Sequence, residues 1–449
     1  MPPDDGSPRK TRMSSMRHQR RMLAVLAGAA VIALTIPFVF PREGQPGMLG
    51  PLWSGAVANV DGETASSGDM ATSSEMAGDT QGPVTTGAAQ SASARGSNPS
   101  TTAAGSPAPT TAATAPGGGP TAAPTVAPPG SAIAVPASID SSGATDASAA
   151  LNAWLATVPN GSTVAFAAGG VYRMDHGLVF SNRHSLTFEG NGATLRANGS
   201  GSAPADSPFA LWQGNDHIVI KDFKIVGNNP HPGRLTSEGQ AAILLHGNSN
   251  VEVSHVTISN PWSDCIYSGV TSSHVGVNGL WFHDSTCTGT GRSGISITGG
   301  SNVTIERVRF NGIGLHVLNI EPDFARDSVS HVYFRNNTVG SYALTTNWIG
   351  FLFASNGAAA KVSDVRVTGN RVTGTAHEGY DGQPRGLNTY VMTAGRSNIV
   401  FSNNTSTQKV AGPALSFQYV NGLTVTGNVQ PLSSGSLAYI NSCTGVTYP

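Results

Sequence analysis

The sequence predicts an all-β fold, a single-stranded right-handed parallel β-helix, for residues 136–449. Three observations lead to this prediction. Short apolar segments recur roughly every 24–34 residues, the length of one unit in a solenoid. Each segment alternates apolar and polar residues with period two, as a half-buried strand does. Gly, Asn and Ser turns separate the segments, and no helical pattern lies between them, so βαβ units are excluded.

The recurring segments form two series. The first series comprises Leu186–Phe188, Ile218–Ile220, Val251–Val253, Leu280–Phe282, Val303–Ile305, Val332–Phe334, Val365–Val367, Ile399–Phe401 and Leu423–Val425. The second series comprises Ile243–Leu245, Cys265–Tyr267, Ile295–Ile297, Leu318–Ile320, Leu415–Phe417 and Leu437–Tyr439. We expect two or three such strands per turn, wound around one apolar core. The usual crossover preference makes the coils right-handed.

Asparagines support this prediction independently. They follow the late strands of the first series at a constant offset, at Asn337, Asn370, Asn404 and Asn428. In the fold they would stack at about 4.8 Å, each amide bonding the next. Other residues hold the same offset in earlier coils, namely Phe223, Val256, Ser285 and Val308. The predicted ladder therefore covers only the last part of the solenoid.

An amphipathic helix is predicted at the start of this domain, over Thr145–Ala156. Thr145 or Asp146 is the expected N-cap, because Thr and Asp side chains accept hydrogen bonds from free backbone N–H groups. We expect this helix to cap the N-terminal open end, since the ends of a solenoid need covering.

Three further segments precede the solenoid. Residues 1–21 form a basic tail, and residues 22–41 form an uncharged apolar stretch. A stretch of that length spans a bilayer as one transmembrane helix, and the basic flank places the N-terminus in the cytoplasm. A cleaved signal peptide is the main alternative, although the nearest A-x-A site, Ala56–Ala58, lies far from the apolar run. Residues 42–135 are rich in Ala, Thr, Pro, Gly and Ser, which predicts a disordered linker. The plasma membrane would then hold the β-helix on its extracytoplasmic side.

The composition of the chain limits the classes of partner and of cysteine site that can be expected. Charged residues make up 11% of the chain and the formal net charge is −1, so a nucleic-acid surface is not expected. Three cysteines do not form a disulfide scaffold or a zinc pattern. Cys265 and Cys287 could pair across adjacent coils or remain free thiols, and Cys443 is left over.

Over about residues 138–449, the chain resembles the pectate-lyase-like right-handed β-helix superfamily. The stretches Asp146–Leu155, Gly161–Tyr172 and Leu186–Leu195 are similar to the usual opening of that group. The resemblance implies the fold, but not the reaction, because the fold hosts lyases, hydrolases, epimerases, tailspikes and adhesins. The polygalacturonase motifs and the Asp-Pro-His-Glu of alginate epimerases are absent from the sequence.

Three elements are similar to ones found in many uncharacterised β-helix proteins, some suspected to act on polysaccharide. These are Ser263–Tyr267, which fits D-x-I-Y, Gly291–Ser296, which fits G-R-x-G-I-S, and Leu318–Asp323, which fits I-D-I-E-P. Asn319 replaces the usual Asp of the third element, so no carboxylate role carries over to that position.

Placing Ile266, Ile295 and Leu318 in register brings these elements together on one sheet. We expect an outward column of substrate-binding residues there, consisting of Tyr267, Ser296 and Asn319. The expected catalytic residues are Asp264, Arg292, Glu321 and His316. Asp264 and Glu321 would lie two coils apart, roughly 10 Å, near the upper end of the range for inverting glycosidases.

Two chemistries remain open at this site. The two carboxylates suit hydrolysis, whereas Arg292 could pair a uronate carboxylate for a lyase or epimerase, with His316 or His283 as the base. His246, one coil earlier, is a more distant candidate for the base, and His283 is also a candidate for substrate binding. No cofactor motif is evident, and calcium is expected only for a lyase.

The alternative is structural. Asp264 could cap a turn while Arg292 forms salt bridges with Asp264 or Glu321, and Asp323 and Asp327 would be solvated loop residues. The leading prediction is a surface-tethered hydrolase or lyase acting on a polysaccharide or cell-envelope glycan. The second is a non-catalytic surface protein that binds glycan. An exposed aromatic and acidic groove favours the enzyme, and a buried, salt-bridged Arg292 favours the binder.

Overall fold

The computed structural model describes residues 132–201, 203–235, 237, 239–344, 352–354, 360–374 and 384–449. The predicted cytoplasmic tail 1–21, the transmembrane segment 22–41 and residues 42–131 of the predicted linker lie outside these ranges. Within these ranges, no helix is long and apolar enough to cross a bilayer. The first strand, β1 (Ile133–Ala134), pairs with β3, so ordered β-structure begins inside the predicted linker.

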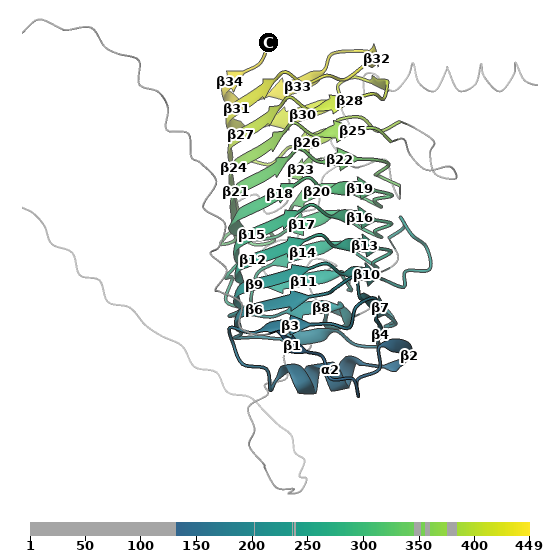
Figure 1. The fold of residues 1–449 in the computed structure, drawn as a ribbon. Coiled ribbons are helices and arrows are strands. Elements are labelled where there is room, and N and C mark those ends of the chain that lie inside the picture. The colour runs from purple at the N-terminus through teal and green to yellow at the C-terminus, as the bar shows by residue number, and fades with distance from the viewer. Residues whose placement is uncertain are drawn as a thin grey trace, which may run out of the picture. The chain divides into compact units, whose positions relative to one another are not determined.

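Three parallel sheets wind around one core, and all but the terminal coils contribute a strand to each sheet in turn (Figure 1). Sheet A contains β1, β3 (Thr163–Ala165), β6 (His184–Glu189), β9 (Asp216–Lys221), β12 (Ser249–Ser254), β15 (Val277–His283), β18 (Gly300–Glu306), β21 (Ser328–Arg335), β24 (Lys361–Thr368), β27 (Arg396–Ser402), β31 (Val420–Thr426) and β34 (Thr444–Thr447).

Sheet B contains β2 (Ser142–Asp146), β4 (Val171–Met174), β7 (Thr194–Ala197), β10 (Lys224–Val226), β13 (Thr257–Ser259), β16 (Thr286–Thr288), β19 (Arg309–Asn311), β22 (Thr338–Val339), β25 (Arg371–Val372) and β28 (Thr405–Ser406). Its strands are short and were not part of either predicted series. A separate small sheet pairs β29 (Val410–Ala411) with β32 (Leu432–Ser434).

Sheet C contains β5 (Leu178–Phe180), β8 (Phe209–Leu211), β11 (Ile243–His246), β14 (Ile266–Gly269), β17 (Ile295–Ile297), β20 (Leu318–Ile320), β23 (Leu352–Ala354), β26 (Thr389–Val391), β30 (Leu415–Gln418) and β33 (Ala438–Asn441). A short 3₁₀ helix, η2 (Pro204–Asp206), precedes β8.

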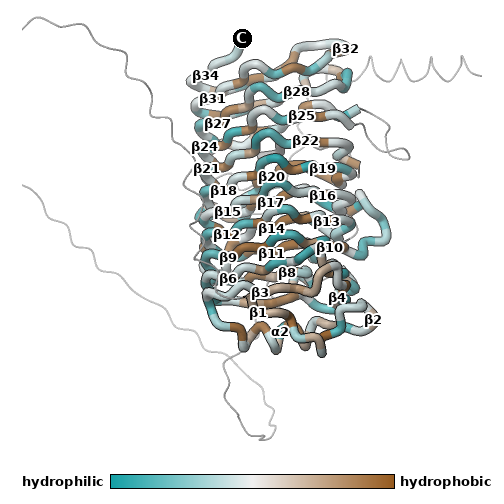
Figure 2. The backbone as a smooth tube through the Cα atoms, viewed as in Figure 1, coloured by the Kyte–Doolittle hydropathy of each residue, from teal (hydrophilic) through white to brown (hydrophobic). Residues whose placement is uncertain are grey.

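The first predicted series is confirmed as sheet A, and its members lie in register from coil to coil. Leu186 pairs with Ile218, Ile218 with Val251, and Val251 with Leu280. The second series is sheet C, with two shifts at strand ends. β14 begins at Ile266 rather than Cys265, and β33 begins at Ala438 rather than Leu437. Alternate residues of these strands point inward and form one continuous apolar core, and hydrophobic residues recur coil after coil along the stack (Figure 2).

The asparagine ladder is confirmed. Asn337 donates its side-chain amide to the Oδ1 of Asn370 at 3.0 Å, Asn370 to Asn404 at 2.9 Å, and Asn404 to Asn428 at 3.1 Å. Each amide also donates to a backbone carbonyl, as Asn370 does to Phe334 at 2.9 Å. These bonds satisfy buried polar groups at the turn after sheet A.

A second, shorter asparagine pair lies at another corner of the coil and was not predicted. Asn215 donates its side-chain amide to Asn248 at 2.8 Å, and Asn248 donates to the carbonyl of Leu211 at 3.0 Å. Both residues are buried. Stacked asparagines therefore bond turns in the early coils as well as in the late ones.

The N-terminal helix is shorter than predicted and has a different N-cap. Helix α2 (Ser148–Leu155) has Ala147 at the N-cap position, without a side-chain hydrogen bond, whereas Thr145 and Asp146 belong to β2. Asp146 still accepts a hydrogen bond from the backbone N–H of Ser148 at 2.9 Å. The buried Leu151 and Leu155 join the continuous core, next to the first coils (Figure 1).

Cys265 and Cys287 form a disulfide, so the first of the two alternatives for these thiols holds. Cys265 lies immediately before β14 in sheet C, and Cys287 lies in β16 in sheet B. Both are fully buried. Cys443 is free and half-buried.

Candidate functional site

The predicted site residues of sheet C come together through the strand register. Tyr267 pairs with Ser296 and Ser296 pairs with Asn319, between inward residues of β14, β17 and β20. The predicted column therefore exists and faces away from the core. Ser296 and Asn319 are nevertheless completely buried, and only Tyr267 is half-buried. Neither Ser296 nor Asn319 is open to a ligand in this structure.

Arg292 and Glu321 contact these buried residues. The Nη1 of Arg292 donates to the Ser296 hydroxyl at 3.5 Å, and Asn319 donates its side-chain amide to Glu321 at 2.9 Å. Ser296 and Asn319 therefore support the charged side chains around them. The Asn at position 319, in place of the usual Asp, suits this contact. An amide can donate a hydrogen bond to Glu321, whereas a carboxylate cannot.

Arg292 bridges the two predicted carboxylates. Its Nη1 lies 3.4 Å from Asp264 and its Nη2 lies 3.0 Å from Glu321. Asp264 is fully buried and also accepts a hydrogen bond from the backbone N–H of Ser293 at 2.7 Å. The side chain of Arg292 is only 13% exposed. The structural alternative therefore describes this triad well, since Asp264 caps a turn and Arg292 is salt-bridged.

The separation of the carboxylates follows from this contact. Because one guanidinium group contacts both, at 3.4 and 3.0 Å, the two carboxylates lie within the span of a single side chain. The same contact places a cation between them. In a hydrolase that space must hold the glycosidic oxygen and the attacking water.

Aromatic rings lie beside the triad on the same sheet. Trp212 contacts His246 edge to face with centroids 4.9 Å apart, and His246 lies 5.9 Å from Tyr267. Gly269 makes this possible, because a Cβ there would lie 2.7 Å from the Tyr267 ring and 2.8 Å from His246. Burial lowers the pKa of His246 to about 4, so its ring is neutral at physiological pH.

Asp323 follows Glu321 on the loop after β20, and the residue is exposed, as predicted. Burial of its carboxyl group and repulsion from Glu321 raise its pKa to about 6. Asp327, by contrast, was predicted to be solvated, and that prediction is wrong. Its side chain is fully buried and accepts a hydrogen bond from the Nδ1 of His274 at 2.6 Å.

His316 lies just before β20 and is buried, with its carbonyl accepting the N–H of Gly294 at 2.9 Å. Its role stays a prediction. His283 does not lie in the predicted site. It is the last residue of β15, in sheet A, whereas Arg292 precedes β17 in sheet C. The sequence held the signal for this, since His283 directly follows a strand of the first series.

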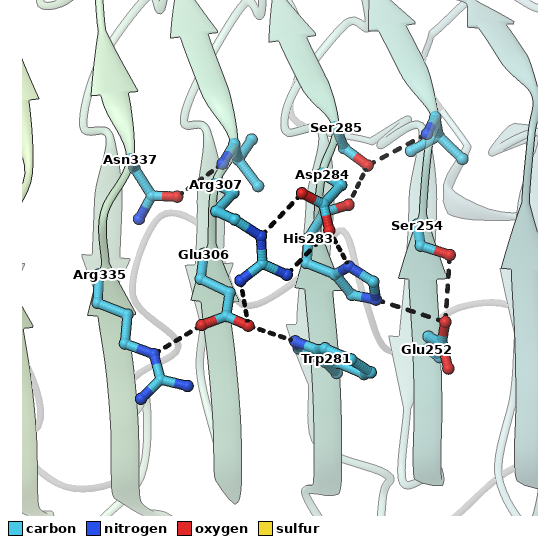
Figure 3. A network of polar contacts seen from close by, with 12 residues as sticks. Glu252, Ser254, Trp281, His283, Asp284, Ser285, Glu306, Arg307, Arg335 and Asn337 are labelled. Atoms are coloured by element: carbon cyan, nitrogen blue, oxygen red, sulfur yellow. Dashed lines mark hydrogen bonds and ion pairs between the residues drawn. The ribbon is translucent and has the colours of Figure 1, made fainter. Parts of the chain in front are cut away.

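His283 belongs instead to a network of charges across four strands of sheet A, shown in Figure 3. We name it the sheet A network; it comprises Glu252, Trp281, His283, Asp284, Glu306, Arg307 and Arg335. His283 stacks on Trp281 with centroids 3.7 Å apart. Its Nδ1 lies 2.7 Å from Asp284 and its Nε2 lies 3.4 Å from Glu252.

The arginines of the sheet A network complete the pairing. Arg307 donates two hydrogen bonds to Asp284, at 2.8 and 2.9 Å, and lies 2.7 Å from Glu306. Glu306 also accepts from Arg335 at 2.7 Å and from the indole N–H of Trp281 at 3.1 Å. Every charged group in the network therefore contacts an opposite charge. Such an arrangement is typical of a structural ion-pair network.

Metal binding has no clear location in the part of the chain that the structure describes. No group of three or more His, Cys, Asp or Glu side chains there is arranged to hold a metal ion.

The fold of this chain is similar to that of several solved β-helix structures. The surface adhesin PfbA of Streptococcus pneumoniae matches with a TM-score of 0.44 and 12% identity, covering 69% of this chain and 100% of that one. A family 28 exopolygalacturonase of Yersinia enterocolitica matches with a TM-score of 0.41 and 11% identity, covering 68% and 76%. An alginate lyase of Paenibacillus sp. matches with a TM-score of 0.38 and 13% identity, covering 67% and 97%.

Identities and scores this low decide nothing about function. The comparison with curated proteins gives no match. The family described as "right handed beta helix region" matches residues 210–447, more than half of the chain. The strand series, the three parallel sheets and this match agree, and the chain belongs to the right-handed parallel β-helix family.

Proposed function

We propose that this chain is an extracytoplasmic β-helix protein that binds a polysaccharide on sheet C, as a binder rather than as an enzyme. One observation favours a binder over an enzyme. Arg292 contacts both predicted catalytic carboxylates and is itself nearly buried. Asp264 and Glu321 are then committed to Arg292, and a charge-paired carboxylate is a poor proton donor.

The chemistry of the surrounding side chains supports a polar, hydroxyl-rich ligand. Trp212, His246 and Tyr267 form an aromatic row with polar tips, and the Tyr267 hydroxyl lies 3.5 Å from the hydroxyl of Thr298. Glu321 adds an acceptor at the end of the row, with its side chain 23% exposed. Aromatic faces with a few fixed polar groups suit amphipathic ligands such as sugar rings.

The disulfide supports an extracytoplasmic location, because disulfides persist in oxidising compartments. The predicted transmembrane segment 22–41 and linker 42–135 would hold the domain outside the plasma membrane on a long tether. Protease treatment of intact cells tests this location. Protection of the β-helix until the cells are lysed would contradict it.

The test of function is a binding and cleavage screen of the purified full-length chain on neutral and acidic polysaccharides. We expect retention on at least one glycan, with no new reducing ends and no absorbance from unsaturated uronate. Tyr267→Ala should weaken binding about tenfold or more, the loss of one aromatic contact. Tyr333→Ala is the matched control, because Tyr333 is a half-buried tyrosine of sheet A. Equal losses in both variants, or binding of no glycan, would refute the proposal.

Hydrolysis is the second candidate, and Asp323 is the observation that favours it. A carboxyl group with a pKa of about 6 beside Glu321 is half protonated near that pH, as a general acid requires. If the screen releases reducing ends, the rate should fall as the pH rises through about 6, because the acid form is then lost. Asp323→Asn should abolish the cleavage without reducing glycan retention. Unsaturated products that disappear with a calcium chelator would instead indicate a lyase.

A further inference from the structure

A polar hollow of about 220 Å³ lies at the corner where the coils turn from sheet C into sheet A. We name it the corner hollow; it is lined by Val270, His274, Gly276, Val277, Asn278, Gly299, Gly300, Ser301, Arg326, Ser328 and Ser330. Glycines in its lining let adjacent coils pack closely. A Cβ at Gly299 would lie 2.2 Å from the Val270 side chain, and one at Gly300 would lie 2.1 Å from the Val277 carbonyl.

Arg326 distinguishes this hollow from the other charged clusters. Arg292, Arg307 and Arg335 each contact a carboxylate. Arg326 is exposed and forms no ion pair with any residue that the structure describes. Its guanidinium lies 5.9 Å from the centre of the Phe324 ring. Hydroxyl groups of Ser301, Ser328 and Ser330 line the same hollow.

Contacts with Asp327 and His274 fix the loop that carries Arg326. Asp327 accepts hydrogen bonds from the Nδ1 of His274 at 2.6 Å and from the backbone N–H of Phe324 at 3.1 Å. The His274 ring contacts the Phe324 ring edge to face, with centroids 4.9 Å apart. Phe324 is 52% exposed. A large apolar ring therefore stands fixed in solvent beside a cation without a carboxylate partner, an arrangement suited to binding rather than to stability.

We propose that the corner hollow binds an acidic sugar unit, with Arg326 pairing its carboxylate or sulfate group and Phe324 packing against the ring. Arg is suited to this because its planar guanidinium donates two parallel hydrogen bonds to an oxyanion. The hydroxyls of the serines match those of a sugar. This proposal rests on the proposed function and deepens it, because the loop Glu321–Asp327 joins the sheet C site to the hollow.

Two acidic residues of this loop have partners of their own. Glu321 contacts Arg292, and Asp327 contacts His274. Asp323 is the remaining acidic residue of the loop. An acidic ligand at Arg326 therefore meets a guanidinium group that forms no ion pair within the described ranges. Salt should weaken such binding, as it weakens surface pairs in general.

The experiment measures binding of the full chain to three oligosaccharides, namely oligogalacturonate, sulfated dextran and neutral cello-oligosaccharide. Arg326→Gln should weaken binding of an acidic oligosaccharide about tenfold, the loss of one charge-assisted contact, and should leave neutral binding unchanged. Arg366→Gln is the matched control, since Arg366 is an exposed arginine of β24 and its loss changes the net charge equally. Oligogalacturonate and sulfated dextran separate the two possible acidic groups.

A second measurement, of the melting temperature with small ligands, tests the corner hollow without the sheet C site. Galacturonate or sulfate ions should raise the melting temperature of the wild type and of Arg366→Gln, but not of Arg326→Gln, because a ligand that binds only the folded state stabilises it. Galactose should do so in none of them. Equal responses of Arg326→Gln and Arg366→Gln would overturn the proposal.

The two proposals fail in different ways. If Tyr267→Ala loses glycan binding and Arg326→Gln has no effect in either measurement, the sheet C site is supported and the proposal for the corner hollow is refuted. If Arg326→Gln changes the thermal shifts but the wild type retains no polysaccharide, the proposed function is refuted. The corner hollow then remains an anion-binding site.

Discussion

The sheet A network and the corner hollow use the same kinds of side chain, arginines and aromatic rings, in opposite ways. In the sheet A network every arginine contacts a carboxylate, and the aromatic ring of Trp281 is stacked and hydrogen-bonded (Figure 3). At the corner hollow, Arg326 forms no ion pair with a carboxylate in the described part of the chain, and Phe324 is 52% exposed. The triad of Asp264, Arg292 and Glu321 lies between these extremes.

The difference teaches how a β-helix separates structure from recognition. Strand residues of adjacent coils repeat at about 4.8 Å, so opposite charges on them meet and neutralise one another. Loops between sheets have no such register, and their charges can remain available to a ligand. A paired cluster should therefore respond to mutation through stability, and an unpaired one through binding.

The largest effect should come from the triad. Asp264→Ala removes a fully buried carboxylate, which leaves the N–H of Ser293 without its acceptor and Arg292 with one carboxylate contact instead of two. Breaking a buried pair in this way costs about 3 kcal/mol or more in the free energy of unfolding. Chemical denaturation measures the loss. A decrease below about 1 kcal/mol would show that the triad is not structural and would revive Asp264 as a catalytic candidate.

Asp327→Ala should have the next largest effect and should act on both properties. It removes the buried acceptor of His274 and of the Phe324 N–H, which costs about 1–3 kcal/mol. Because these bonds hold the loop of Arg326, binding of oligogalacturonate should weaken as well. Denaturation and binding are measured on the same variant. Destabilisation with unchanged binding would show that the loop needs no such support.

The sheet A network should make stability depend on pH through His283. Burial opposes its charge, but the contacts with Glu252 and Asp284 outweigh that cost and raise its pKa above the usual value near 6.5. Its stabilising contribution is then complete below about pH 6.5 and is lost as the pH rises through the raised pKa. His283→Gln should remove this part of the pH dependence. A wild type and a variant with parallel stability curves between about pH 5.5 and 9 would contradict the assignment.

The smallest effect should come from the exposed end of the same network. Arg307 pairs with the partly exposed Asp284 and with the buried Glu306, but Glu306 keeps Arg335 and Trp281 as donors when Arg307 is lost, and the Arg307 side chain is 45% exposed. Arg307→Gln should lower the free energy of unfolding by about 0.5 kcal/mol or less, as exposed ion pairs do. Glycan binding should not change. If Arg307→Gln reduced binding as strongly as Arg326→Gln, the distinction between paired and unpaired arginines would fail.

The sequence by itself determined what repeats. Period-two alternation placed Leu186, Ile218 and Val251 in one column of sheet A, and the constant offset after each strand placed Asn337 above Asn370. Backbone pairing between identical coils leaves little freedom, so such features follow from spacing alone.

Only the tertiary structure decided what does not repeat. Arg292 lies on both carboxylates, Ser296 and Asn319 are covered, Cys265 meets Cys287, and Asp327 is buried under the loop of Arg326. Each of these depends on the path of a loop or corner between sheets. Loop side chains take their direction from contacts with residues one or two coils away, and no period in the sequence encodes those contacts. The strands of sheets A and C were therefore predictable from their spacing, whereas for the site the sequence predicted most of the residues that come together and not their contacts.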